Sequence, residues 1–264
     1  MLRPAVAVAV VLIAAMLTGC RTDEVSLAFH PTTGTTYAYT TSVDSTTHTE
    51  LPGRTVPDQH DHATISSHEH VLAASQDIAR VEVVLDRPGS GQRTYVMRFD
   101  RAAQLTQVES VEGIPAGALG DLGLDEIFPP AAGAPPDHPL RQGDTWSIDD
   151  HVQLSATDPP AQLTGTGRLV ELGVVGGRRT ATVRSTTALP VRTTSSTSAS
   201  TQSLDGVQTT ELTITYDLAD GAVNHVSALT VARYALTISP PAGERAAPIV
   251  GSLVVVVRSE TSRG

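Results

Sequence analysis

The sequence predicts a mainly β fold, in which a curved antiparallel sheet forms a half-barrel or two lobes. Threonine and valine recur in short alternating runs, which is the pattern of strands with one buried face. Aromatic residues make up only 3% of the chain, so the core has to be built from Val, Leu, Ile and Ala. Helical periodicity is weak throughout. We therefore expect a sheet with at most one short helix or lid.

Five strands are predicted in the first half of the chain. In the run from Tyr95 to Phe99, the side chains of Tyr95, Met97 and Phe99 share one face and Arg98 lies on the other. Such alternation is expected of a strand that is buried on one side only. The predicted strands lie at 37–47, 63–73, 81–85, 95–99 and 105–110.

The segment 113–138 is predicted to interrupt the strands. Leu119, Leu122 and Ile127 could form one apolar stripe of a short helix or lid, although the glycines between them weaken it. Four prolines follow between 129 and 136, and proline cannot contribute to a sheet ladder. We expect a helix or lid followed by a proline-rich linker.

Six further strands are predicted in the second half of the chain. The apolar phase changes within 223–238, which predicts a bulge or bend near Ala232-Arg233. Leu253–Val257 is an unbroken apolar run, typical of a strand covered on both faces, and we expect it to close the sheet. The Ser/Thr-rich stretch 193–201 is interpreted as a loop or an edge strand. The predicted strands lie at 145–154, 163–172, 179–187, 212–216, 223–238 and 253–257.

The two halves of the chain resemble each other. Gly34–Tyr37 and Gly143–Trp146 both open a Thr-rich strand, and an aromatic–Asp pair ends a later strand in each half. The aspartates of these pairs, Asp100 and Asp217, are predicted to cap turns through local backbone hydrogen bonds. Either a β unit was duplicated or a chain rich in Thr and Val matches itself by chance; we favour duplication.

Residues 17–20 resemble the lipobox of bacterial lipoproteins: Leu17-Thr18-Gly19-Cys20 follows an apolar run and contains the only cysteine. The apolar run Ala5–Leu17 is shorter than the roughly 20 residues of a membrane-spanning helix. We therefore expect cleavage before Cys20 and lipidation of its sulfur. Two acyl chains, such as palmitate, would hold the protein at the extracytoplasmic face of the cell membrane.

These observations divide the chain into five parts. They are a signal peptide at 1–19, a short tether at 20–25, a first β unit at 26–112, the helix or lid with its linker at 113–138, and a second β unit at 139–264.

Composition argues against most kinds of chemistry. Acylation of Cys20 leaves no thiol for a disulfide, a zinc site or a nucleophile. All 18 basic residues are arginine, which excludes Schiff-base and P-loop lysines. No Gly-x-Ser-x-Gly or His-Glu-x-x-His motif is present. The formal net charge of −10 repels nucleic acid. We expect no enzyme, no cofactor and no nucleic-acid partner.

The lipobox, the step from Pro139 to Trp146 and the turn from Tyr216 to Gly221 resemble a family of actinobacterial lipoproteins. More loosely, the chain is similar to LolA-like lipoproteins of the LppX/LprG type. That resemblance implies a curved antiparallel half-barrel with short helices, which encloses an apolar cavity for acylated lipids. It assigns no binding residue.

Two sets of residues are candidates for a binding site. The first comprises aromatic side chains that could line a cavity or fill the core: Tyr37, Tyr39, Phe99, Trp146 and Tyr216. The second comprises four histidines at even-numbered positions, so that on paired strands they would share one face, as metal ligands must. A solvated surface is the alternative explanation for the same pattern. The four are His60, His62, His68 and His70.

Three functions remain open at this point. We favour a non-catalytic lipoprotein that binds a lipid or another apolar ligand in a concave sheet. The alternative is an envelope adaptor that binds another protein through a sheet edge or the Ser/Thr-rich loop, without a small-molecule ligand. The third is divalent-metal binding through the segment His60–His70.

Overall fold

The computed structural model describes residues 23–87, 89, 91–115, 135–152, 160–197, 200–241 and 246–264. These residues form one antiparallel sheet of 13 strands and no helix. Its strands are β1 (Thr36–Leu51), β2 (Arg54–Thr55), β3 (Gln59–Ala74), β4 (Ile78–Arg87), β5 (Gly91–Asp100), β6 (Leu105–Val111), β7 (Ile114–Pro115), β8 (Thr145–Val152), β9 (Ala161–Val175), β10 (Arg178–Ser196), β11 (Thr201–Asp217), β12 (Val223–Ser239) and β13 (Ile249–Arg263).

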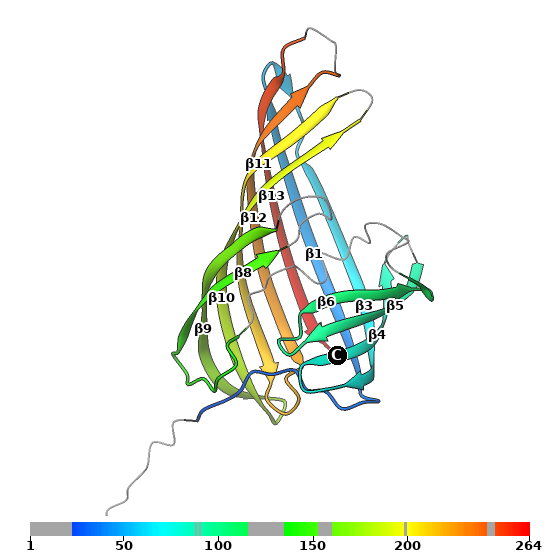
Figure 1. Cartoon of the computed structure of the whole chain (residues 1–264), viewed down its shortest axis with the longest axis vertical. Helices are drawn as coiled ribbons and strands as arrows, with labels where there is room; N and C mark the ends of the chain where they lie inside the picture. The colour runs from blue at the N-terminus through cyan, green and yellow to red at the C-terminus, as the bar shows by residue number, and fades with distance from the viewer. Residues whose placement is uncertain are drawn as a thin grey trace, which may run out of the picture.

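The sheet is continuous and curved, and it is not two separate lobes. Its order is β7-β6-β5-β4-β3-β1-β13-β12-β11-β10-β9-β8, with β2 paired to β1. Strands β7 and β8 lie at the two ends of this order and do not pair with each other in the described part of the chain (Figure 1). The predicted mainly β, curved antiparallel fold is confirmed. The predicted helix or lid falls largely on residues 116–134, which lie outside the described residues.

The two halves of the chain are successive meanders that meet where β1 pairs with β13. They also open with the same backbone contacts: the Gly34 N–H donates to Val71 O (2.8 Å), and the Gly143 N–H donates to Leu169 O (2.7 Å). This repeated geometry supports duplication of a β unit, which stays a prediction.

Both predicted aspartate caps are confirmed. Asp100 Oδ1 accepts from the Ala102 N–H (2.8 Å), and Asp217 Oδ1 accepts from the Ala219 N–H (2.9 Å). Each carboxylate therefore fixes the turn that follows its strand, β5 or β11, because it satisfies a backbone donor that the turn leaves unpaired.

The bulge predicted near Ala232 is wrong, because β12 runs through this position without one. Its pairing with β13 runs without a shift from His225 to Ile238, and its inward side chains include the buried Ala228, Ala232 and Leu236. Leu229 and Val231 therefore lie on the outer, convex face, where they are half-buried. The apolar phase therefore changes along β12 because apolar side chains lie on both faces of this strand.

Strands β10 and β13 differ in part from expectation. β13 is interior, as its apolar run predicts, but Leu253–Val257 are half-buried and not fully covered. The Ser/Thr-rich stretch lies largely in a hairpin of interior strands, because Ser196 at the end of β10 pairs with Thr201 at the start of β11.

The core consists mainly of two apolar clusters, one for each half of the sheet. The segment leading into β1 crosses the lower end of the sheet and joins them (Figure 1). Val25 bridges to Leu140, and the Phe29 N–H donates to Arg101 O (2.5 Å). The predicted tether thus reaches the folded part at Val25, which is 6% exposed.

Candidate functional site: a cavity on the concave face

A cavity of about 130 Å³ lies on the concave face, between the two core clusters. Its walls come from both halves of the sheet and from the segment before β1. The lining residues are Phe29, Tyr39, Thr41, Ser67, Glu69, Phe99, Ala102, Ala103, Gln104, Leu105, Leu212, Ile214, Tyr216, Val223, Val226, Ser259 and Thr261.

One side of the cavity is apolar. Leu212, Ile214 and Tyr216 of β11 contribute to it because every second residue of a strand faces the same way. Val226 of β12 pairs in register with Ile214 and extends the apolar surface. Phe29, from the segment before β1, also lines the cavity. This side suits a hydrocarbon chain or ring.

The other side of the cavity is polar and comes from β1, β3 and β13. Thr41 pairs in register with Thr261, and their hydroxyl oxygens lie 2.9 Å apart in a hydrogen bond. Thr41 and Ser67 are buried, whereas Ser259 and Thr261 are half-buried. The cavity is therefore amphipathic and reaches the exposed part of the concave face at this side.

Among the described lining residues, Glu69 is the only one that carries a carboxyl group. In register it lies between Tyr37 of β1 and Val83 of β4, both of which are buried. It forms no hydrogen bond or ion pair with another residue of the described part of the chain. Burial raises the pKa of its carboxyl from 4.5 to about 7. The pKa of the neighbouring Tyr39 hydroxyl is also raised, first by burial and then by the Glu69 charge.

A paired charge cluster lies next to the cavity. Asp217 is fully buried and forms ion pairs with Arg178 (Nε to Oδ2, 2.5 Å) and Arg263 (Nη1 to Oδ2, 3.8 Å). The Arg263 guanidinium also lies over the Tyr37 ring, 4.6 Å from its centroid. The Tyr37 hydroxyl donates to Asp220 Oδ2 (3.1 Å). These contacts place Arg263 between a carboxylate and an aromatic ring, while its Nη1 has no hydrogen-bond partner among the described residues.

The structure brings three of the five predicted aromatic residues to the cavity: Tyr39, Phe99 and Tyr216. Tyr37 belongs to the adjacent core and is 2% exposed. Trp146 lies on edge strand β8 and packs against Gly167, away from the cavity. The remaining lining residues were not predicted, although alternation placed Leu212 on the same face as Tyr216.

The four predicted histidines share the convex face of β3 and do not form a metal centre. His62 Nδ1 lies 2.8 Å from Asp44 Oδ1, and His60 Nδ1 lies 3.1 Å from Thr46 Oγ1. Among the described residues, no group of three or more His, Cys, Asp and Glu side chains is arranged to hold a metal ion.

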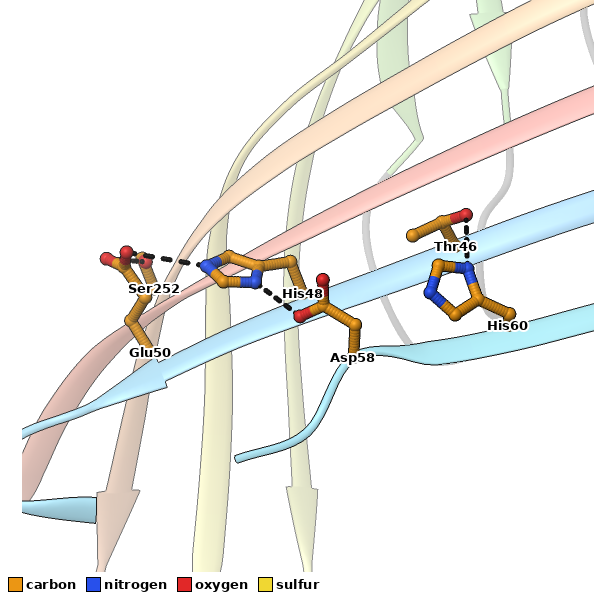
Figure 2. A network of polar contacts seen from close by, with 6 residues as sticks. All are labelled: Thr46, His48, Glu50, Asp58, His60 and Ser252. Atoms are coloured by element: carbon orange, nitrogen blue, oxygen red, sulfur yellow. Dashed lines mark hydrogen bonds and ion pairs between the residues drawn. The ribbon is translucent and has the colours of Figure 1, made fainter. Parts of the chain in front are cut away.

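A fifth histidine extends this polar face onto β1. Figure 2 shows His48 between two carboxylates, with Nδ1 2.6 Å from Asp58 Oδ1 and Nε2 3.4 Å from Glu50 Oε1. Ser252 donates to the other oxygen of Glu50 (3.1 Å). Hydrogen bonding to Asp58, and then to Glu50, raises the pKa of His48. This network connects β1 to β13 and to the segment before β3.

The chain matches no protein-family model and no curated protein. The described part of the chain offers no helix long and apolar enough to cross a membrane.

Proposed function

We propose that this protein is a membrane-anchored, extracytoplasmic lipoprotein that binds an apolar ligand, or the apolar part of a lipid, on its concave face. The cavity carries this proposal, because its apolar side is formed jointly by both halves of the sheet. The lipobox ending at Cys20 supplies the expected anchor. A non-catalytic role agrees with the absence of the sequence motifs named above.

The size of the cavity limits what it can enclose. Ligand pockets commonly measure roughly 300–1,000 Å³, whereas an apolar cavity of about 150 Å³ holds benzene. At about 130 Å³, this cavity accommodates a ring or a short stretch of chain. A longer ligand would continue along the half-buried inward side chains of Val255 and Val257 on β13 and Tyr234 on β12.

An adaptor role is the second candidate, and the convex face favours it. Val231 of β12 and Val256 of β13 pair in register on that face, next to Leu229 and Val254. These side chains are half-buried, and they form an apolar area that a partner protein could cover. The histidine segment lacks a third metal ligand among the described residues, so metal binding is not proposed.

Lipid analysis of the full-length protein tests the proposal. The protein is extracted with detergent from membranes of its own host, and organic extracts are compared with those of the Cys20→Ala variant. We expect acyl chains on Cys20, a co-purifying apolar compound, and loss of the variant from the membrane fraction. A wild-type protein that retains residues 1–19 and carries neither acyl chain nor ligand would contradict the proposal.

A further inference from the structure

Glu69 is half-buried on the polar side of the amphipathic cavity, where its carboxyl has no partner among the described residues. Its neighbours along the inner face of β3 are Ser67 and Val71, both buried. A carboxyl group that loses part of its water without gaining a hydrogen bond destabilises the fold, whereas an apolar side chain at the same position would not. A partner supplied by a ligand would offset that cost.

The surroundings of the carboxyl favour one kind of ligand. In the part of the lining that the structure describes, Glu69 is the only residue with an ionisable group that is charged near neutral pH. Arg263 of β13 lies 3.8 Å from Asp217 and over the Tyr37 ring, and it is not among the residues that line the cavity. Among the described residues, the lining thus offers an unpaired acceptor to a ligand and no cationic side chain to an anion.

We propose that the ligand carries a primary amine whose N–H groups bind the Glu69 carboxyl, while its apolar part packs against Leu212, Ile214 and Val226. This inference rests on the proposed function and specifies the chemistry of the ligand at the same site. Burial of the amine beside Glu69 replaces lost water by a charge-assisted hydrogen bond. Fatty acids and phosphate head groups are disfavoured at this position, because they would place a second negative charge beside the carboxylate.

The pH dependence follows from the groups around Glu69. These are Tyr37 and Tyr39 of β1, Arg263 of β13, Tyr216 of β11, and Asp220 in the turn before β12. The pKa values of the three tyrosines are all raised, so these hydroxyls stay neutral. Amine binding should therefore strengthen as pH rises through about 7, where Glu69 ionises.

Three probes of the size of the cavity test the inference: benzylamine, benzyl alcohol and benzoate. Their binding to the full-length protein in nanodiscs is measured by ligand-observed NMR at pH 8, for wild type, Glu69→Gln and Glu82→Gln. Glu82 is the matched control, because it lies on the convex face of the neighbouring strand β4. We expect wild type and the control to bind benzylamine at least tenfold more tightly than benzoate, and Glu69→Gln to lose this preference.

The outcomes separate the inference from the proposed function. Equal binding of the three probes to wild type, or an unchanged amine preference in Glu69→Gln, would overturn the amine assignment and leave the apolar site standing. Failure of all three probes to bind wild type would overturn the ligand site itself and the amine assignment with it.

Discussion

At the scale of single residues, the Glu69 carboxyl makes the stability of the fold depend on pH. Its pKa in the fold is about 7, above the ordinary value of 4.5, so the fold favours the protonated form. Its contribution to stability is therefore complete below pH 4.5 and is lost as pH rises through 7. We expect Glu69→Gln to be more stable than wild type at pH 8, by about 2–3 kcal/mol.

Urea unfolding at several pH values measures this difference. The two proteins should unfold at the same urea concentration near pH 4 and diverge above it, with Glu69→Gln the more stable. A difference that is constant from pH 4 to pH 8 would show that the fold does not raise the pKa of Glu69.

Asp217 is the second residue with a large expected effect. Asparagine at this position keeps the acceptor for the Ala219 N–H but removes the charge that pairs with Arg178 and Arg263. Breaking one side of a buried ion pair costs about 3 kcal/mol or more. We expect Asp217→Asn to lower the free energy of unfolding by that amount, as measured by circular dichroism in urea.

The matched control is Asp100→Asn at the equivalent turn of the first half. Asp100 caps its turn in the same way and is only partly buried. Its loss of charge should cost less than about 1 kcal/mol, as is usual away from buried networks. Equal losses in the two variants would mean that the caps, and not the ion pairs, determine the effect.

At the scale of elements, the packing of β8 on β9 depends on a glycine. A Cβ atom at Gly167 would lie 2.2 Å from Cε2 of Trp146, so the indole ring has room only because the side chain is absent. Overpacking of this kind costs about 1–3 kcal/mol. We expect Gly167→Ala to lower the melting temperature and to shift the fluorescence of Trp146, the only tryptophan.

Gly173 on the same strand provides the comparison. A Cβ atom there would meet Thr180 Oγ1 at 3.5 Å, an ordinary contact. Gly173→Ala should leave both the melting temperature and the fluorescence unchanged. If the two variants behaved alike, the close approach of Trp146 to β9 would not hold.

Elements were predictable to the extent that one face of each strand is apolar. β4 and β5 follow this rule, with Val81, Val83, Tyr95 and Met97 all buried. The rule failed for β12, because Ala228 and Ala232 face inward with small side chains while Leu229 and Val231 lie outward. The alternation of apolar and polar residues shows that the two faces of a strand differ. It does not indicate which of the two faces lies on the concave side of the sheet.

The candidate site was less predictable than the elements. Tyr39 and Glu69 lie on strands that the sequence predicted, yet their approach to Val226 depends on the pairing of β1 with β13. Those strands lie at opposite ends of the chain. No local pattern specifies a pairing across more than 200 residues, so the aromatic candidates could be named but not assigned to one cavity.

At the scale of the whole molecule, the cavity exists because the two halves share one sheet. The β1–β13 pairing places the polar side of the cavity at the junction, and the segment before β1 supplies Phe29 at its edge. Neither half contains the complete lining. Ligand binding should therefore require the whole folded chain, which makes a change inside the cavity the most direct test of the proposed function.

The decisive measurement is native mass spectrometry of the full-length protein, extracted from its host, in three forms: wild type, Val226→Trp and Ser227→Trp. Val226 lines the cavity, whereas Ser227, one residue along β12, is exposed on the convex face. Circular dichroism checks that each form is folded. Wild type and Ser227→Trp should carry a bound ligand mass, and folded Val226→Trp should not. A ligand retained equally by all three forms, or absent from wild type, would contradict a binding site in this cavity.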